Sequence, residues 1–392
     1  MSLPRPSQLI RSRLLSPLHA FIRDSRSVGI TLISCTIISI FLSNSAWSAG
    51  YLAFWNKELA MPATGVHLPH TVLHLINDAL MALFFLLAGM EIKRELLAGE
   101  LASIKKSLLP VMAALGGMIV PALIYTLWCG GTAFRNGWGI PMATDIAFSL
   151  GILSLLGNKA PLSLRIFLTA LAIIDDLGGI LTIAVFYSGE LQLQYILLAA
   201  LMVVVLITMN LLKISRTWLY FIPGLLLWYF VFNSGIHATI AGILLALTIP
   251  MKKIDKLEHT LHSPVNFIIL PLFALANTTI VFPAGLHAVF TSPVHHGILT
   301  GLFIGKPLGI FLFSFLAIKT GIAALPAGIR LKHLAGMGMV AGIGFTMSIF
   351  MATLAFPSPE TQLVAKIAII GASLLSGICG YTWLRLMKKR EM

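Results

Sequence analysis

Four ionisable side chains stand inside long apolar stretches of the sequence. Asp145 lies in GIPMATDIAFSLG, the adjacent Asp175 and Asp176 lie in LTALAIIDDLGGILTIAVF, and Lys306 lies in GLFIGKPLGIFLF. Burial at low dielectric disfavours the charged form of a carboxylate, so such a group can release its proton near neutral pH and then bind a small hard cation. Oxygen ligands suit sodium-like ions, and these stretches offer no thiolate or paired histidine for a transition metal. The residues predict a site at which a proton and a cation compete for one carboxylate.

The composition places these side chains in a membrane protein. Of 392 residues, 58% are hydrophobic and only 10% are charged, whereas a soluble domain carries roughly 25% charged residues. Apolar runs of about 20 residues, the length that crosses a bilayer, recur from Val28 to Leu386. We expect a cytoplasmic N-terminal segment over 1–25 and a single membrane domain over 26–392.

The apolar runs predict an all-α polytopic fold with twelve spanning helices. Their expected ranges are 26–45, 71–97, 107–129, 133–156, 162–187, 194–212, 217–232, 235–250, 261–281, 297–318, 333–356 and 363–387. The longest non-helical piece is expected over 46–70, as an external loop at the membrane interface.

The distribution of basic residues predicts the orientation. The formal net charge of +13 would point to an acidic partner such as nucleic acid in a soluble protein. Here the basic residues stand in short loops. If the N-terminus is inside and the sides alternate, all 27 Lys and Arg except Lys57, Arg135, Lys306 and Lys366 lie at the inner side. This asymmetry favours twelve spans with both termini in the cytoplasm, and we expect no nucleic-acid partner.

The four buried charges lie at a common depth. Asp175 follows Arg165 by ten residues and Lys306 follows His296 by ten, which places both roughly 15 Å into the membrane. Asp145 lies halfway along its own helix. A charge at the bilayer centre costs a few kcal/mol or more, so it usually serves transport. The alternative is a purely structural network of buried ion pairs.

The two adjacent aspartates differ by about 100° around their helix, so they cannot both face one partner. We expect one carboxylate to bind the cation and the other to be held by Lys306.

Two of the predicted helices carry residues that interrupt a helix. The residues are Gly137, Gly139 and Pro141 before Thr144 and Asp145, and Gly336, Gly338, Gly342 and Gly344 before Phe345 and Thr346. Glycine also serves ordinary close packing in spanning helices. As a pair, the segments predict broken helices that meet at a midplane site. Asp145 would then face exposed helix N-termini, and Lys306 would face exposed C-termini.

A second set of titratable residues is expected near the inner surface. Glu91, Arg94 and Glu95 share one helical face, and the predicted loop KKIDKLEHTLHSP carries Glu258, His259 and His262. Histidines titrate near physiological pH. Ordinary interfacial solvation explains such a cluster equally well, and His237, near an outer helix end, is as ambiguous.

The segments NDALMALFFLLAGMEIKREL, GIPMATDIAFSLG, LAIIDDLGGI, GIHATIAGI, GLFIGKPLGI and GIGFTMSIF closely resemble the NhaA-type sodium/proton antiporters. The resemblance implies two inverted repeats of three helices each and a smaller interface domain. It also implies that the two interrupted helices cross near Asp145. Asp176 would be the main cation and proton carboxylate, with Asp175 beside it and paired with Lys306. Thr144, Asp145, Gly344 and Thr346 would support the midplane site.

The resemblance further implies a secondary transporter rather than an enzyme, with no cofactor. It would exchange cytoplasmic sodium or lithium ions for a larger number of external protons. The positions Glu91, Arg94, Glu95, Glu258, His259, His262 and His237 would be tied to pH regulation. Members sit in bacterial inner membranes, commonly as homodimers. This chain departs from the family in its longer segment before Ser25 and in its poorly matching 46–70 segment.

Three other functions fit the sequence less well. An intramembrane aspartyl protease needs two converging aspartates, but its GxGD-type segment is absent. A sodium-coupled symporter of similar fold would need a larger polar cavity. A passive channel fits poorly, because buried proton-binding carboxylates suit exchange better than steady conduction.

Overall fold

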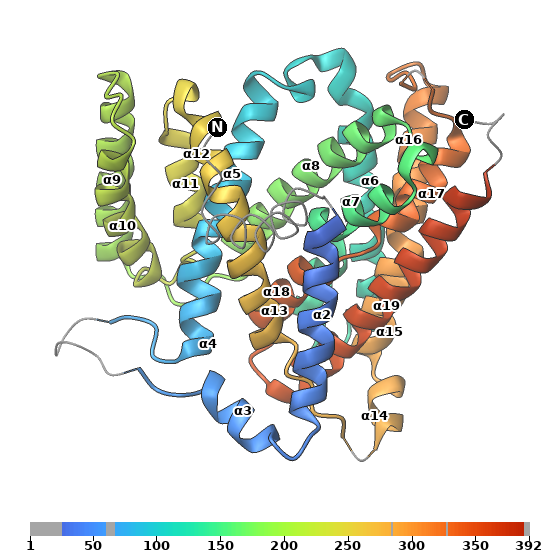
Figure 1. The fold of residues 1–392 in the computed structure, drawn as a ribbon, viewed down its shortest axis with the longest axis horizontal. Helices are drawn as coiled ribbons and strands as arrows, with labels where there is room; N and C mark the ends of the chain where they lie inside the picture. Colours follow the sequence, from blue (N-terminus) through green and yellow to red (C-terminus); the bar gives the residue numbers. More distant parts are fainter. Residues whose placement is uncertain (1–25, 60–66, 284, 327, 388–392) are drawn as a thin grey trace, which may run out of the picture.

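The computed structural model describes residues 26–59, 67–283, 285–326 and 328–387, which are almost entirely helical (Figure 1). Within these ranges no strand forms, and the only bridge pairs Glu58 with Thr71. The prediction of an all-α, multi-span membrane protein is confirmed. The predicted segment 1–25 and the basic residues Lys388, Lys389 and Arg390 lie outside the described residues.

Eight helical stretches in the described part of the chain are long and apolar enough to span a membrane. They are Val72–Leu97, Lys105–Cys129, Arg135–Leu155, Leu162–Phe186, Leu193–Leu211, Met251–Asn277, Pro293–Lys319 and Pro359–Leu386. The number rises to ten if two bent pairs count as one span each. These are Ser27–Ser43 with Ser48–Trp55, bent by 118°, and Leu331–Ala341 with Phe345–Ala355, bent by 50°.

The remaining two predicted spans are shorter helices. The range 217–232 forms α10 (Trp218–Phe232, 15 residues), and the range 235–250 forms only α11 (Ile240–Thr248, 9 residues). Neither is long enough on its own to cross the hydrocarbon layer, which needs about 20 residues. The other uninterrupted helices are α2 (Arg26–Ser43), α6 (Ile104–Cys129), α8 (Leu162–Phe186), α9 (Leu193–Leu211), α14 (Leu286–Thr291) and α19 (Pro359–Leu386).

Two predicted loops are partly helical. The 46–70 segment contains α3 (Ser48–Trp55). Its Trp55 is buried, and the Tyr51 hydroxyl donates a hydrogen bond to the Leu275 carbonyl at 2.9 Å, so tertiary contacts hold this short helix. The predicted loop before residue 261 is α12 (Met251–Pro264).

The sequence of α12 explains why it was mistaken for a loop. Its composition is polar, but Ile254, Leu257 and Leu261 recur at three- and four-residue spacing and line one face. Ile254 is fully buried, and Leu257 and Leu261 pack against the core. An amphipathic helix of this kind needs no continuous apolar run.

Three helices widen into a π-turn, a feature frequent at functional sites. The turns are η1 (Ile76–Leu80) between α4 (Val72–Leu75) and α5 (Met81–Leu97), η5 (Val265–Ile269) between α12 and α13 (Leu270–Asn277), and η6 (Gly301–Gly305) between α15 (Pro293–Thr300) and α16 (Lys306–Lys319). The last of these ends directly before Lys306.

Close packing between α6 and α16 fixes the orientation of Lys306. A Cβ atom added at Gly309 would lie 2.0 Å from the Gly116 carbonyl oxygen, so only glycine permits this approach. Lys306 is one helical turn before Gly309, and the contact aims its side chain toward the interior. In Figure 1, α9 and α10 stand at the opposite edge of the molecule, beside α11 and α12.

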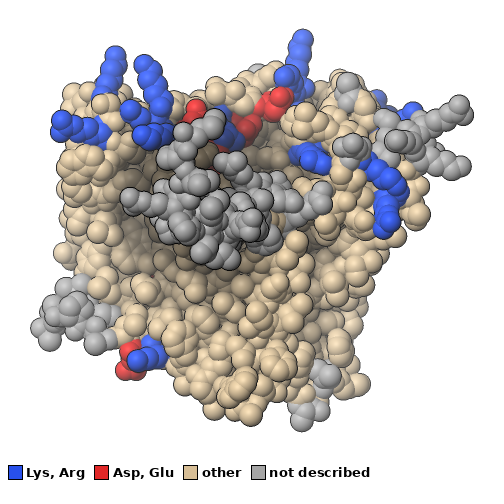
Figure 2. Space-filling view, in the orientation of Figure 1, with Lys and Arg blue, Asp and Glu red and all other residues tan. Residues whose placement is uncertain are grey.

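Lys and Arg side chains gather along one rim of the molecule, and the face below that rim is almost free of them (Figure 2). This is the pattern of a protein that spans a membrane with its basic loops on one side.

Candidate ion-binding site

Two helix interruptions meet in the middle of the molecule. The first separates η3 (Arg135–Met142) from α7 (Ile146–Leu155), and the second separates α17 (Leu331–Ala341) from α18 (Phe345–Ala355). The Asp145 amide donates a hydrogen bond to the Ile343 carbonyl at 2.7 Å, which joins the two breaks directly.

Asp145 accepts hydrogen bonds at the N-termini of two helices. Its Oδ1 accepts from the amide of Phe148 at 3.0 Å, so Asp145 is the N-cap of α7. Its Oδ2 accepts from the amide of Thr346 at 3.0 Å and from the Thr346 hydroxyl, at the start of α18. The Asp145 side chain is buried, and the partial positive charges of the helix ends stabilise its carboxylate.

Two serines link the interrupted segments at this junction, one from each segment. The Ser149 hydroxyl of α7 donates to the Val340 carbonyl at 3.1 Å, and the Ser348 hydroxyl of α18 donates to the Ile140 carbonyl at 2.8 Å. Each serine satisfies a carbonyl in the last turn of the other interrupted segment. Neither serine was predicted from the sequence, although each stands four residues after an N-cap residue, Asp145 or Gly344.

Gly344 permits the close approach of the second break. A Cβ atom there would lie 2.1 Å from the Ser348 Oγ and 3.0 Å from a Leu302 methyl carbon. Any other residue would displace the Ser348 hydroxyl from its carbonyl partner.

Asp175 and Lys306 form a buried ion pair. The Nζ of Lys306 lies 2.9 Å from Oδ2 of Asp175, and neither side chain is exposed. Lys306 also donates to the carbonyl of Met142, the last residue of η3, so the ammonium faces a helix C-terminus. The Thr144 hydroxyl lies 2.7 Å from the same Asp175 oxygen and 3.1 Å from the Ala341 carbonyl, so its single proton is shared between two acceptors.

Asp176 has a different environment. It lines a cavity of about 330 Å³ together with Thr144, Asp145 and Thr346, whereas Asp175 and Lys306 do not line it. Among the described contacts, Asp176 Oδ1 is buried and has no hydrogen-bond partner. Oδ1 of Asp175 is likewise buried and unpartnered, so the two aspartates differ in their other surroundings. Asp175 forms an ion pair with Lys306, whereas Asp176 lines the cavity and has no ion-pair partner in the described structure. Carboxylate oxygens of this kind are the ligands that a small hard cation prefers.

The same cavity reaches the predicted inner cluster. Glu91, Arg94, Glu258 and His262 also line it. Arg94 bridges α5 and α12 through an ion pair with Glu258 and contacts Glu95 at 3.3 Å. The cavity thus connects a mouth rich in titratable groups with Asp176.

The remaining inner residues differ in their contacts. His262 Nε2 lies 3.1 Å from the Asn266 side-chain amide nitrogen, and Asn266 lines the cavity in η5. His259 is exposed on α12.

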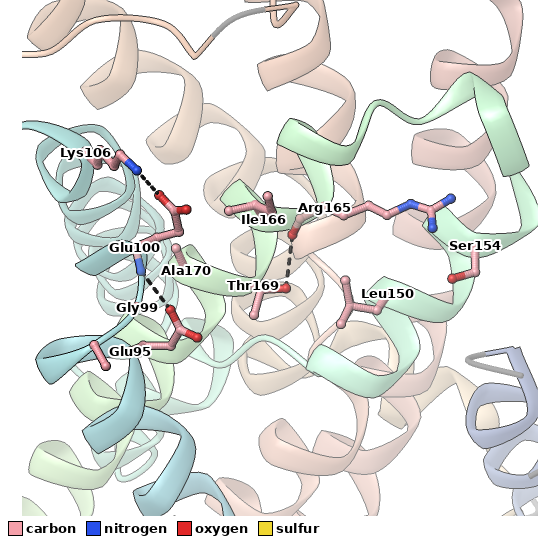
Figure 3. A pocket seen from close by; sticks show the side chains of 11 residues that line it. Glu95, Gly99, Glu100, Lys106, Leu150, Ser154, Arg165, Ile166, Thr169 and Ala170 are labelled. Atoms are coloured by element: carbon pink, nitrogen blue, oxygen red, sulfur yellow. Dashed lines mark hydrogen bonds and ion pairs between the residues drawn. The ribbon is translucent and has the colours of Figure 1, made fainter. Parts of the chain in front are cut away.

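A second pocket, of about 640 Å³, opens beside the first (Figure 3). Thr169 and Leu150 line both pockets. Its rim carries an ion pair between Lys106 and Glu100 at 3.2 Å, and the Arg165 side chain extends toward Ser154. The protein is therefore hollowed next to the site.

His237 is not near the other predicted pH-response residues. Its Nδ1 lies 3.8 Å from Oδ1 of Asp78, and it does not line the inner cavity. Asp78 precedes Glu91 by thirteen residues along one helical stretch, a rise of roughly 20 Å. The structure brings together Glu91, Arg94, Glu95, Glu258 and His262 at the cavity mouth. His259 is exposed on α12, and His237 lies toward the opposite end.

Comparisons with known proteins identify the family. The family model described as Na+/H+ antiporter 1 matches residues 19–384. The chain is 49% identical over 379 residues to Na(+)/H(+) antiporter NhaA 1 of Flavobacterium johnsoniae, which covers 95% of this chain and 97% of that relative. It is 47% identical to Na(+)/H(+) antiporter NhaA of Cytophaga hutchinsonii, with 95% and 96% covered. It is 46% identical to Na(+)/H(+) antiporter NhaA of Citrobacter koseri, with 94% and 97% covered. This chain therefore belongs to the NhaA family of Na+/H+ antiporters, which are multi-pass membrane transporters and not enzymes.

Proposed function

We propose that this protein exchanges cytoplasmic Na+ or Li+ for external H+ at Asp176, electrogenically and under pH control, in the bacterial inner membrane. The observation that carries the proposal is the difference between the two adjacent aspartates. Lys306 and Thr144 contact Asp175, whereas Asp176 lines the cavity and has no ion-pair partner in the described structure.

Competition at Asp176 couples the two ions. When Asp176 is ionised, its carboxylate offers oxygen ligands to a sodium or lithium ion that enters the inner cavity, which Thr144 also lines. When Asp176 is protonated, the cation has no charged ligand there and leaves. No ATP and no cofactor enters this cycle, because the ion gradients supply the free energy.

Alternating access uses the two interrupted helices. We propose a fold of twelve spans with both termini in the cytoplasm, in which two inverted repeats of three helices contribute one interrupted helix each, beside a smaller interface domain. The reciprocal bonds of Ser149 and Ser348, each four residues after an N-cap, support a two-fold relation between the repeats. Movement of one repeat against the other would expose Asp176 to each side in turn.

Electrogenic exchange requires a second group that changes its protonation. Asp175, which forms the ion pair with Lys306, is the neighbour of Asp176 in α8. Thr144 contacts Asp175 and also lines the cavity. We assign Lys306 the role of Asp175's charge partner. If sodium binding breaks that pair, the buried Lys306 ammonium loses its counter-charge and gives up one proton, which is the additional proton released.

The pH response is assigned to the residues at the inner mouth. Arg94 and Glu258 join α5 to α12, and the neighbouring titratable residues are Glu91, Glu95, His259 and His262. Protonation of Glu258 removes its ion pair with Arg94 and frees the two helices. His237 contributes from the other end. The proposal of a homodimer rests on the family resemblance.

Sodium-induced proton release from inverted membrane vesicles tests the proposal. Wild type is compared with Asp176→Asn, and with Asp255→Asn as a control at an exposed position on α12. The pH range from about 6.5 to about 8.5 covers the titration of histidine. Wild type and the control should release protons and Asp176→Asn should not. Absence of sodium-dependent proton movement in wild type at every pH would overturn the proposal and favour a symporter.

A further inference from the structure

Three titratable side chains converge at the end of the protein opposite the inner cavity mouth. Asp78 lies in the π-turn η1, and its Oδ2 is 2.8 Å from Nε2 of His74, one helical turn earlier. Its Oδ1 is 3.8 Å from Nδ1 of His237, which comes from the segment before α11. The two carboxylate oxygens thus face one histidine each, from two different parts of the chain.

The three side chains differ in exposure, and His74 is the one open to water. The His74 side chain is 46% exposed, that of His237 is 16% exposed, and that of Asp78 is 9% exposed. His70 extends the series outward, with its ring 6.5 Å from that of His74. A proton entering from water meets His74 first and reaches the buried carboxylate next.

The surroundings of the cluster add no fixed charge. Trp228 donates its indole N–H to the Asp78 backbone carbonyl at 3.0 Å, and the Phe232 ring lies 5.8 Å from that of His74. In the described structure, the ionisable groups that face Asp78 are His74 and His237. No group of three or more His, Cys, Asp or Glu in the described ranges is arranged to hold a metal ion. The chemistry that remains for this cluster is proton binding.

An aromatic barrier lies between this cluster and the ion site. The His237 ring packs on the Phe350 ring at 5.5 Å, and Phe350 is fully buried against Phe85 and Phe273. Phe350 is four residues after Thr346, the residue that binds Asp145, so one turn of α18 separates the barrier from the site. That turn spans roughly 6 Å.

We propose that His74, Asp78 and His237 form the outer proton-loading site, from which protons pass the Phe350 barrier to reach Asp176. This inference rests on the proposed function and adds the residues that receive the external proton. A proton binds the His74 imidazole, moves to the Asp78 carboxylate through their hydrogen bond, and passes to His237. Movement of the Phe350 ring during alternating access opens the route from His237 toward Asp176. The proton is the only atom transferred along this path.

Sodium efflux from right-side-out vesicles, at fixed internal pH and variable external pH, tests this proposal. The variants are Asp78→Asn and His74→Gln, with His287→Gln as a matched control at an exposed histidine of α14. The external proton concentration that gives half-maximal efflux should be higher in both test variants. The expected increase is about threefold or more, which equals half a pH unit. The His287→Gln control should match wild type at every external pH. Half-maximal concentrations equal to wild type in both variants would overturn the proposal.

A titration without transport separates the two hypotheses. Nuclear magnetic resonance of His74 in the purified, folded protein should show a titration midpoint that shifts when Asp78 is replaced by Asn. If Asp78→Asn shifts the His74 midpoint but the wild type performs no exchange, the result contradicts the proposed function alone. Normal exchange with an unshifted midpoint would contradict the outer site alone. His74→Gln, at a half-exposed position, provides the transport result if Asp78→Asn does not fold.

Discussion

The Nζ of Lys306 lies 2.9 Å from Oδ2 of Asp175, with both side chains fully withdrawn from solvent. This pair neutralises one of two adjacent carboxylates in the middle of a spanning helix. The other carboxylate, Asp176, lines the cavity and has no ion-pair partner in the described structure. The predictions below follow from this difference and from the helix junction that surrounds it.

Replacing Lys306 by Gln should destabilise the protein strongly. Asp175 would be left as a buried carboxylate without a counter-charge, and breaking one half of a buried pair costs about 3–5 kcal/mol. The melting temperature in detergent should fall well below that of Lys319→Gln, a variant at the exposed end of the same helix.

The double variant Lys306→Gln with Asp175→Asn should recover a large part of that loss, because both charges are then absent. A double variant no more stable than the single one would contradict the pairing. If Lys306→Gln kept full electrogenic exchange, the lysine would have only a structural role.

Replacing Asp145 by Ala should destabilise the helix junction and reduce exchange. The substitution removes the acceptor for the Phe148 amide and for both donors of Thr346. One lost N-cap costs about 1 kcal/mol, and here two helix starts lose their acceptor. The decrease in melting temperature should exceed that of Thr346→Ala, which removes only the hydroxyl. A smaller decrease in Asp145→Ala than in Thr346→Ala would contradict this arrangement.

The serines at the junction should behave as a matched pair. Ser149→Ala and Ser348→Ala each remove one donor to a buried helix-end carbonyl, and each should cost about 1–3 kcal/mol. Thermal unfolding should show similar decreases for both variants. The control Thr320→Ala, at an exposed hydroxyl bonded within its own helix, should be close to wild type. Wild-type stability in either serine variant would show that its bond does not hold the junction.

The sequence reveals buried charge more readily than it reveals partners. Asp145, Asp175, Asp176 and Lys306 were found because a charge in an apolar run is locally visible. The bond from the Thr346 amide to Asp145 was not found, since it joins distant segments. The 100° separation predicted that the two aspartates face different partners, but not which one faces Lys306. That choice depends on the close approach of α6 and α16, and only the family resemblance anticipated it.

Helix boundaries in polar stretches were also not predicted. The polar composition of α12 predicts a loop, but three apolar residues recur on one face and make it an amphipathic helix. His74 was not predicted, because a single histidine near a helix start forms no recognisable sequence motif. Its relation to Asp78 needs only a four-residue spacing, but its relation to His237 depends on the packing of distant segments.

Replacing Glu258 by Gln should flatten the dependence of exchange on internal pH. The variant cannot form the ion pair with Arg94 and corresponds to permanently protonated Glu258. Rates should be measured in inverted vesicles, whose medium contacts the cytoplasmic side of the protein. The pH of the medium is varied and the pH of the vesicle lumen is held fixed. Glu360→Gln, at an exposed acidic residue, is the control. The slope of rate against pH should fall in Glu258→Gln and remain normal in the control. An unchanged slope would remove Glu258 from the pH response.

Sodium binding to the purified protein, measured against pH, tests the central claim most directly. If a proton and Na+ compete for Asp176, the apparent Kd rises as pH falls, by about tenfold per pH unit once the carboxylate is mostly protonated. Isothermal titration calorimetry should show this trend in wild type and no saturable binding in folded Asp176→Asn. A Kd that stays constant across pH, or sodium binding retained by Asp176→Asn, would contradict the assignment of Asp176 as the shared site.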